Sequence, residues 1–167
     1  TVCLLKSEPT INFAGVTMSE RPILDAIKVQ SKVVIPIVKA LEREIGKARA
    51  HQVVGDAIAG AYVQYRERRG FEPDQHPSVE VDGQAFPVEQ ATRHNDDDYY
   101  ANDVTKCAFA EYFCSLGEPE IGALMTCGVD FAAEELMRPT WAFERTQTLM
   151  QGANYCDFRW RRKPSET

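Results

Sequence analysis

The stretch from residue 143 to residue 161 constrains the fold more than any other part of the chain. Its first half, FERTQTLM, places residues of different polarity at two-residue spacing, which is the periodicity of a β-strand. QGAN at 151–154 has the composition of a turn, and CDFRWR at 156–161 alternates again. These features predict a β-hairpin with many polar and reactive side chains around one turn. They form either a solvated amphipathic face or part of a site.

Two helical patterns occupy the first 70 residues. Apolar residues recur at helical spacing from Ile23 to Ile45 and again from Val54 to Tyr65. Pro36 predicts a kink or a division inside the first pattern, and the second ends in a basic run followed by Gly70, a common helix C-terminus. We therefore expect long amphipathic helices whose apolar faces pack on a sheet or on a second copy of the chain.

The middle of the chain contains turns and then a strand. Asp82-Gly83 predicts a hairpin turn. His94 precedes the acidic cluster Asp96–Asp98, which either binds a hard cation or forms a solvated loop. Residues 99–106 favour a strand that runs into Cys107, at the start of a short helix.

A longer helix is predicted from Pro119 to about Met137, because proline suits a first helical turn. Cys127, Asp130 and Glu134 would then share one face of that helix. The order of helices, a strand, further helices and a hairpin predicts an α+β fold. Its antiparallel sheet would be packed by helices, with long amphipathic N-terminal helices and a C-terminal β-hairpin.

Length and charge narrow the class of protein. A chain of 167 residues suits a single domain (1–167), with a mainly helical part (1–70) and an α+β part that holds a ligand pocket (78–162). The net charge of −6 and the absence of a basic stripe predict no nucleic-acid partner. No apolar run suits a membrane span and the first residues do not resemble a signal peptide, so we expect a cytoplasmic protein without a membrane partner.

The cysteines are odd in number and include no CxxC pair, which predicts reduced thiols and no zinc ribbon. Cys107, Cys127 and Cys156 fall on separate predicted elements and could converge in space. Each is otherwise a small buried apolar residue, as free cysteines usually are. Cys3 and Cys114 are interpreted as structural.

Three blocks of the C-terminal half resemble the L-2-amino-thiazoline-4-carboxylic acid hydrolase family. They are TKCAFAEYFCSLGEPEIGAL at 105–124, CGVDFAAEE at 127–135 and FERTQTLMQGANYCDFRW at 143–160. The resemblance implies a hydrolase acting on the non-peptide C–N bonds of a cyclic amidine, as in the conversion of L-2-amino-thiazoline-4-carboxylate to N-carbamoyl-cysteine. The blocks are more distantly similar to small-molecule-binding α+β domains of the four-vinyl-reductase type, which implies a pocket between sheet and helices.

A reaction of this kind requires an anchor for the substrate carboxylate. Arg145 and Arg159 are the candidates, because a guanidinium binds both carboxylate oxygens. Thr146 and Thr148 are further candidate substrate-binding residues beside them. The alternative is that the arginines pair with neighbouring acidic residues and only hold the hairpin.

Two mechanisms remain open for the attack on the ring. In the first, a single zinc ion activates a water molecule. Its candidate ligands are Cys107, Cys127, Asp130 and Cys156. In the second, no cofactor is needed, since Cys156 or Cys107 is the nucleophile and a carboxylate or His94 transfers protons. Asp130 and Glu134 form a candidate acid/base pair on one helix face.

The rival interpretation is a non-catalytic module of the same fold that binds a small molecule or a metal. A structural role is third, with the amphipathic N-terminal helices as the interface of a homo-oligomer. In the first two interpretations the partner is a small molecule.

Overall fold

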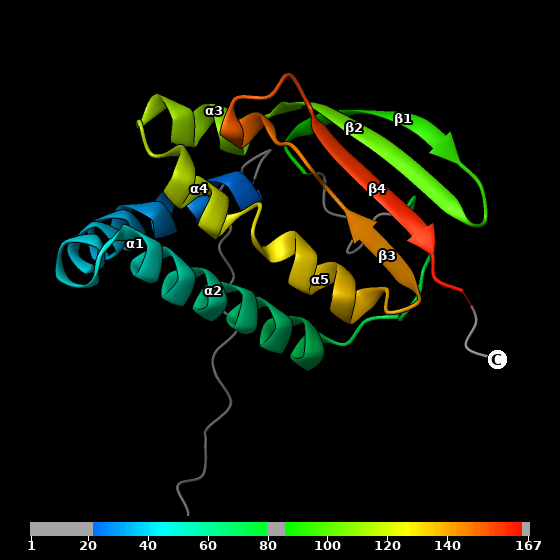
Figure 1. Ribbon diagram of the computed structural model, residues 1–167, viewed down its shortest axis with the longest axis horizontal. Helices are drawn as coiled ribbons and strands as arrows, with labels where there is room; N and C mark the ends of the chain where they lie inside the picture. Colours follow the sequence, from blue (N-terminus) through cyan, green and yellow to red (C-terminus); the bar gives the residue numbers. More distant parts are fainter. Residues whose placement is uncertain (1–21, 80–85, 165–167) are drawn as a thin grey trace, which may run out of the picture.

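The computed structural model describes residues 22–79 and 86–164, and Figure 1 shows their arrangement. Four strands form one antiparallel sheet in the order β1-β2-β4-β3. The α+β class and the antiparallel sheet predicted from the sequence are thus confirmed. The elements are α1 (Pro22–Ile45), α2 (Lys47–Arg69), β1 (Val88–Asn95), β2 (Tyr99–Cys107), α3 (Ala108–Ser115), α4 (Pro119–Met125), α5 (Val129–Met137), β3 (Trp141–Glu144), the 3-10 turn η1 (Leu149–Gln151) and β4 (Cys156–Arg162).

The N-terminal half consists of two long helices joined at Gly46. Helix α1 continues through Pro36 without dividing. Gly46 has a φ of 79°, a conformation that glycine adopts without steric cost, so the chain turns there into α2. Gly70 ends α2, where the sequence predicts the end of the helix. The turn predicted at Asp82-Gly83 lies outside the described residues.

Two apolar clusters hold the elements together. The larger joins the helices: Phe113, Ile121 and Val38 are almost fully buried at its centre, and Met150 of η1 packs against it. The second is aromatic and lies on one face of the sheet, where Tyr100, Trp141, Trp160, Phe143 and Phe158 pack together. Figure 1 shows α1 to α4 on one side of the molecule, the sheet on the other, and α5 between α2 and β3.

The predicted helix from Pro119 to Met137 is divided. Thr126–Gly128 separates α4 from α5, because the Gly128 N–H donates to the carbonyl of Ala123 (2.7 Å) and the Thr126 hydroxyl to that of Gly122 (2.8 Å). Both bonds close the end of α4. Cys127 therefore lies in a turn, and Asp130 in the first turn of α5.

The C-terminal hairpin is present, but its first strand is shorter than the alternation suggests. Strand β3 ends at Glu144, and the chain reaches β4 through an irregular segment and η1. Asp157 explains the departure, since its carboxylate accepts the N–H groups of Thr146 (2.9 Å) and Gln147 (2.8 Å). Those groups therefore do not continue the sheet.

Candidate functional site

Arg145 leaves the end of β3 and reaches the start of α5. Its Nη1 donates to Asp130 Oδ2, and its Nη2 donates to the carbonyl of Cys127 at 2.9 Å. The guanidinium carbon lies 5.2 Å from the ring centre of Phe131 and 5.3 Å from that of Phe158, and the side chain is only 6% exposed. A guanidinium between two rings and a carboxylate is fixed in position and shielded from water.

Asp130 is the carboxylate best placed for proton transfer. Its Oδ1 has no hydrogen-bond partner among the described residues, and its side chain is 33% exposed, so one oxygen is open to a ligand or water. Burial raises the pKa of Asp130 to about 6; the attraction and hydrogen bond of Arg145 oppose this rise, and the charge of Glu134 adds to it. A carboxyl group that titrates near neutral pH suits a general base.

Three thiols lie within range of the Asp130 charge. That charge raises the pKa of Cys107, Cys127 and Cys156, although burial is the largest cause in each case. The pKa of Cys127 reaches about 11. At Cys107, which caps α3, burial outweighs the favourable backbone N–H groups of the first helical turn. The described residues thus bring the three predicted cysteines near one carboxylate, with their thiols protonated at neutral pH.

The four candidate zinc ligands do not form a metal site in the described part of the chain. There, no group of three or more His, Cys, Asp or Glu side chains is arranged to hold a metal ion. The sulfur of Cys156 accepts the backbone N–H of Leu149 at 3.2 Å.

Glu134 lies one helical turn beyond Asp130 and links α5 to the sheet. Its Oε2 accepts a hydrogen bond from Trp160 Nε1 at 2.8 Å. Both of its oxygens accept hydrogen bonds from Arg138 Nη1, each at 2.9 Å. Arg138 also donates from Nε to the carbonyl of Gln75 at 3.0 Å. This chain of bonds fixes α5 against β4, and it keeps a second negative charge near Asp130.

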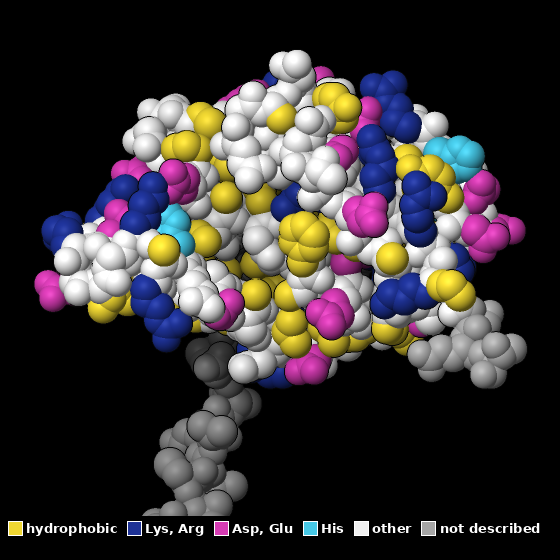
Figure 2. All heavy atoms as spheres, in the orientation of Figure 1, with side chains coloured by type: hydrophobic (Ala, Val, Ile, Leu, Met, Phe, Trp, Pro, Cys, Tyr) yellow, Lys and Arg dark blue, Asp and Glu magenta, His cyan; other side chains and the backbone are white. Residues whose placement is uncertain are grey.

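Arg159 is outside this cluster. Side chains alternate along β4, so Arg159 projects from the face opposite to Phe158 and Trp160. Its guanidinium donates to Asp103 Oδ1 (2.8 Å) and to the carbonyl of Asn102 (3.0 Å). Figure 2 shows basic and acidic side chains interspersed over the strands. Of the two arginines only Arg145 belongs to the cluster, and a substrate contact stays a prediction for both.

The two threonines stabilise the segment between β3 and β4. The Thr146 hydroxyl donates to Asp157 at 2.6 Å. Thr148 is buried and caps η1, where its hydroxyl accepts the N–H of Gln151 at 3.1 Å. Both side chains hold the loop that carries Arg145, and direct contact with a substrate stays a prediction for each.

His94 lies far from Cys107. His94 pairs with Ala101 of β2, and Cys107 ends the same strand six residues later. At about 3.3 Å per residue, this separation is about 20 Å. The Nε2 of His94 lies 2.5 Å from Asp96 Oδ2. This contact, with the N–H groups of Asp98 and Tyr99, lowers the pKa of Asp96 to about 2. The acidic cluster therefore closes the β1–β2 turn.

Asn102 is a candidate that the sequence analysis missed. It is 6% exposed, and its Nδ2 donates to Gln90 Oε1 at 2.7 Å, but its buried Oδ1 has no partner in the described structure. Asn102 pairs with Phe158 across β2 and β4, so both side chains project from the face that carries the cluster. A polar residue amid aromatic ones on a sheet face is the signal that could have identified it.

The fold and this cluster define the class of the protein. A carboxyl group with a raised pKa, a shielded guanidinium and thiols that are buried or partly buried, on an α+β scaffold, are features found in the sites of hydrolytic enzymes. The family model described as L-2-amino-thiazoline-4-carboxylic acid hydrolase matches residues 26–160, and the chain belongs to this family. A search of curated proteins finds no match. Among the described helices, none has the length and apolar character needed to cross a membrane.

Proposed function

We propose that the protein is a hydrolase that opens a small cyclic C=N ring bearing a carboxylate, with L-2-amino-thiazoline-4-carboxylate as the first candidate substrate. The family assignment supports the reaction class. The observation that carries the proposal is Asp130, whose pKa is raised to about 6 and whose free oxygen lies beside the Arg145 guanidinium.

In the proposed reaction, the Asp130 carboxylate removes a proton from a water molecule. The water oxygen bonds to the ring carbon of the C=N group, and the bond from that carbon to the ring sulfur breaks. The two protons of the water end on the ring nitrogen and on the departing sulfur, the latter delivered by Asp130. The product is N-carbamoyl-cysteine with a free thiol, so the atoms balance with one water consumed.

The neighbouring side chains would bind and orient the ring. The Arg145 guanidinium has five N–H groups and donates two hydrogen bonds, one to Asp130 and one to the Cys127 carbonyl. Its remaining N–H groups would donate to the substrate carboxylate. Phe131 and Phe158 offer flat apolar walls. The free Oδ1 of Asn102 would accept an N–H of the amino group on the ring.

A mass-spectrometric assay tests the proposal. The protein, purified with its metals retained, is incubated with L-2-amino-thiazoline-4-carboxylate, and we expect the mass of one water to be added and one free thiol to appear. Binding of the compound without turnover by folded protein would instead favour the non-catalytic binding module. If folded protein neither binds nor converts the compound, L-2-amino-thiazoline-4-carboxylate is not the substrate.

The cysteine variants separate a water nucleophile from a thiol nucleophile. Because burial raises the pKa of all three thiols, we expect Cys156→Ser, Cys107→Ser and Cys127→Ser each to keep kcat within about threefold of the wild type. A folded Cys156→Ser variant that loses turnover, together with a covalent adduct on the wild-type thiol, would assign the attack to Cys156.

The variant Asn102→Leu separates a binding role from a structural one. An apolar residue of similar shape removes a buried acceptor that has no partner, so we expect the melting temperature to stay the same or rise. Loss of one hydrogen bond to the substrate should raise KM by about tenfold. Unchanged KM would show that Asn102 does not contact the substrate; Ala91→Leu, a neighbouring position on β1, is the control for added volume.

A further inference from the structure

Helix α1 is apolar on two opposite faces. One face carries Leu24 and Val38, which are buried in the core. The other carries Val29 (65% exposed), Val33 (61%) and Ile37 (52%), which follow one another at four-residue spacing. A surface helix normally has one apolar face, which packs on the core, so a second apolar face exposed as a ridge indicates a contact surface.

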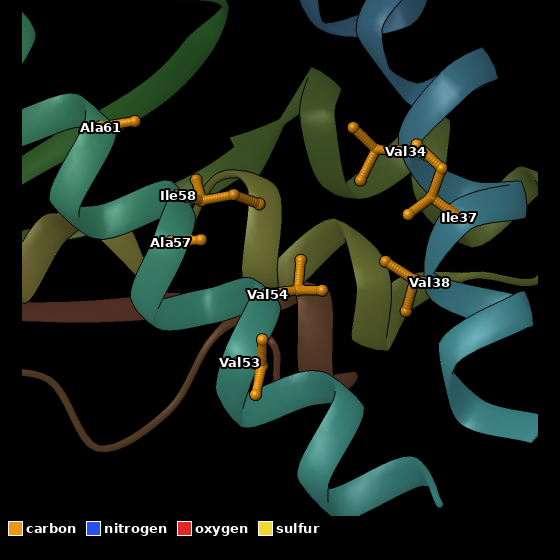
Figure 3. A pocket seen from close by; sticks show the side chains of 8 residues that line it. All are labelled: Val34, Ile37, Val38, Val53, Val54, Ala57, Ile58 and Ala61. Atoms are coloured by element: carbon orange, nitrogen blue, oxygen red, sulfur yellow. The ribbon is translucent and has the colours of Figure 1, made fainter. Parts of the chain in front are cut away.

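A groove lies beside the ridge, between α1 and α2. Figure 3 shows side chains of both helices directed into it, and its volume is about 280 Å³. Ile37 belongs to both ridge and groove, and Val53 on the α2 wall is 39% exposed. All lining residues are apolar: Val34, Ile37, Val38, Val53, Val54, Ala57, Ile58 and Ala61.

We infer that this surface is the interface of a homodimer, in which the α1 helices of two copies pack antiparallel about a two-fold axis near Val33. With the axis near Val33, the ridge of one copy packs against the ridge of the other, and the groove extends the apolar surface beside it, as an isologous contact allows. In each copy, helices α1 and α2 are each about 35 Å long and about 10 Å wide, so together they present roughly 700 Å². Stable interfaces bury about 800 Å² per partner.

The charges on α1 support a second copy in this orientation. Asp25 lies in the first turn and Arg43 in the last turn. The two are 18 residues apart, which is about five turns, so they project from the same side of the helix. Their midpoint is next to Val33, and an antiparallel pair therefore sets Asp25 of each copy near Arg43 of the other. Within the described residues Asp25 has only a loose contact with Lys28 (3.9 Å), and Arg43 has no ion pair.

Sedimentation velocity of the purified chain over micromolar concentrations tests the inference. We expect a species of twice the 18.8 kDa chain mass. Val33→Glu should weaken dimerisation at least tenfold, since it places two like charges at the axis, whereas Leu116→Glu, at an exposed apolar residue between α3 and α4, should leave the dimer intact.

The charge pair provides the test of orientation. Asp25→Arg and Arg43→Asp should each weaken the dimer several-fold, and the double variant should restore it. A wild-type monomer at every concentration, or a dimer that a folded Val33→Glu variant leaves unchanged, would overturn the interface. Failure of the double variant to recover would overturn the antiparallel arrangement. None of these outcomes depends on hydrolytic activity.

Discussion

Replacing Asp130 by asparagine should lower kcat/KM by about 10²–10⁴-fold, the usual contribution of a general base. The amide keeps the shape of the side chain and can still accept a hydrogen bond from Arg145, but it cannot remove a proton from water. Steady-state assays with Asp130→Asn measure the loss. Glu135→Gln is the matched control, because Glu135 is an exposed carboxylate on the same helix and should tolerate the same change.

The pH profile makes this expectation specific to Asp130. In the wild type, kcat/KM should fall as the pH drops through about 6, because protonation of Asp130 removes the base. The raised pKa also means that the folded state binds a proton that the unfolded state releases. The contribution of Asp130 to stability is therefore favourable below its unfolded pKa and is lost as the pH rises through about 6. Both effects should be absent from Asp130→Asn, and an unchanged acid limb there would assign the base elsewhere.

Replacing Arg145 by glutamine should raise KM by about 10–100-fold, the loss expected for charge-assisted hydrogen bonds to a carboxylate. The same change removes the positive charge that opposes the rise in the pKa of Asp130. The acid limb of the rate profile should therefore move to higher pH. Because Arg145 is shielded and donates to two acceptors, stability should also fall by about 1–3 kcal/mol.

Two comparisons make the Arg145 result decisive. Arg161→Gln, an exposed arginine on β4 that packs over Tyr99, should change neither KM nor the pH profile. If Arg145→Gln lowers only the melting temperature and leaves KM and the acid limb in place, Arg145 holds the segment after β3 and does not anchor a substrate.

Local sequence patterns predicted much of the fold. Glycine at position 70 and the basic run before it marked the end of α2, and Cys107 was placed at the start of a helix. The alternation after residue 156 marked β4. The break at Thr126–Gly128 was not predicted, because it depends on the bond from Gly128 to the Ala123 carbonyl rather than on a strong helix-breaking residue.

The site was harder to predict than the fold because its members meet through tertiary contacts. The sequence suggested Asp130 and Arg145 separately, and their pairing depends on β3 ending at Glu144 beside α5. The register of β2 with β4 places Asn102 opposite Phe158, and no local pattern contains that information. Burial raises the pKa of the Cys107 thiol, whereas its position at a helix N-terminus suggested the reverse.

The aromatic cluster gives the protein a built-in optical reporter. Both tryptophans of the chain, Trp141 and Trp160, lie on the sheet face and are nearly buried, whereas α1 and α2 contain no tryptophan. Indole emission therefore describes the environment of the sheet and of the Glu134 carboxylate that Trp160 contacts, while far-ultraviolet circular dichroism is dominated by the helices. Followed together during denaturation, the two signals distinguish loosening of the sheet from melting of the helical layer without any added label.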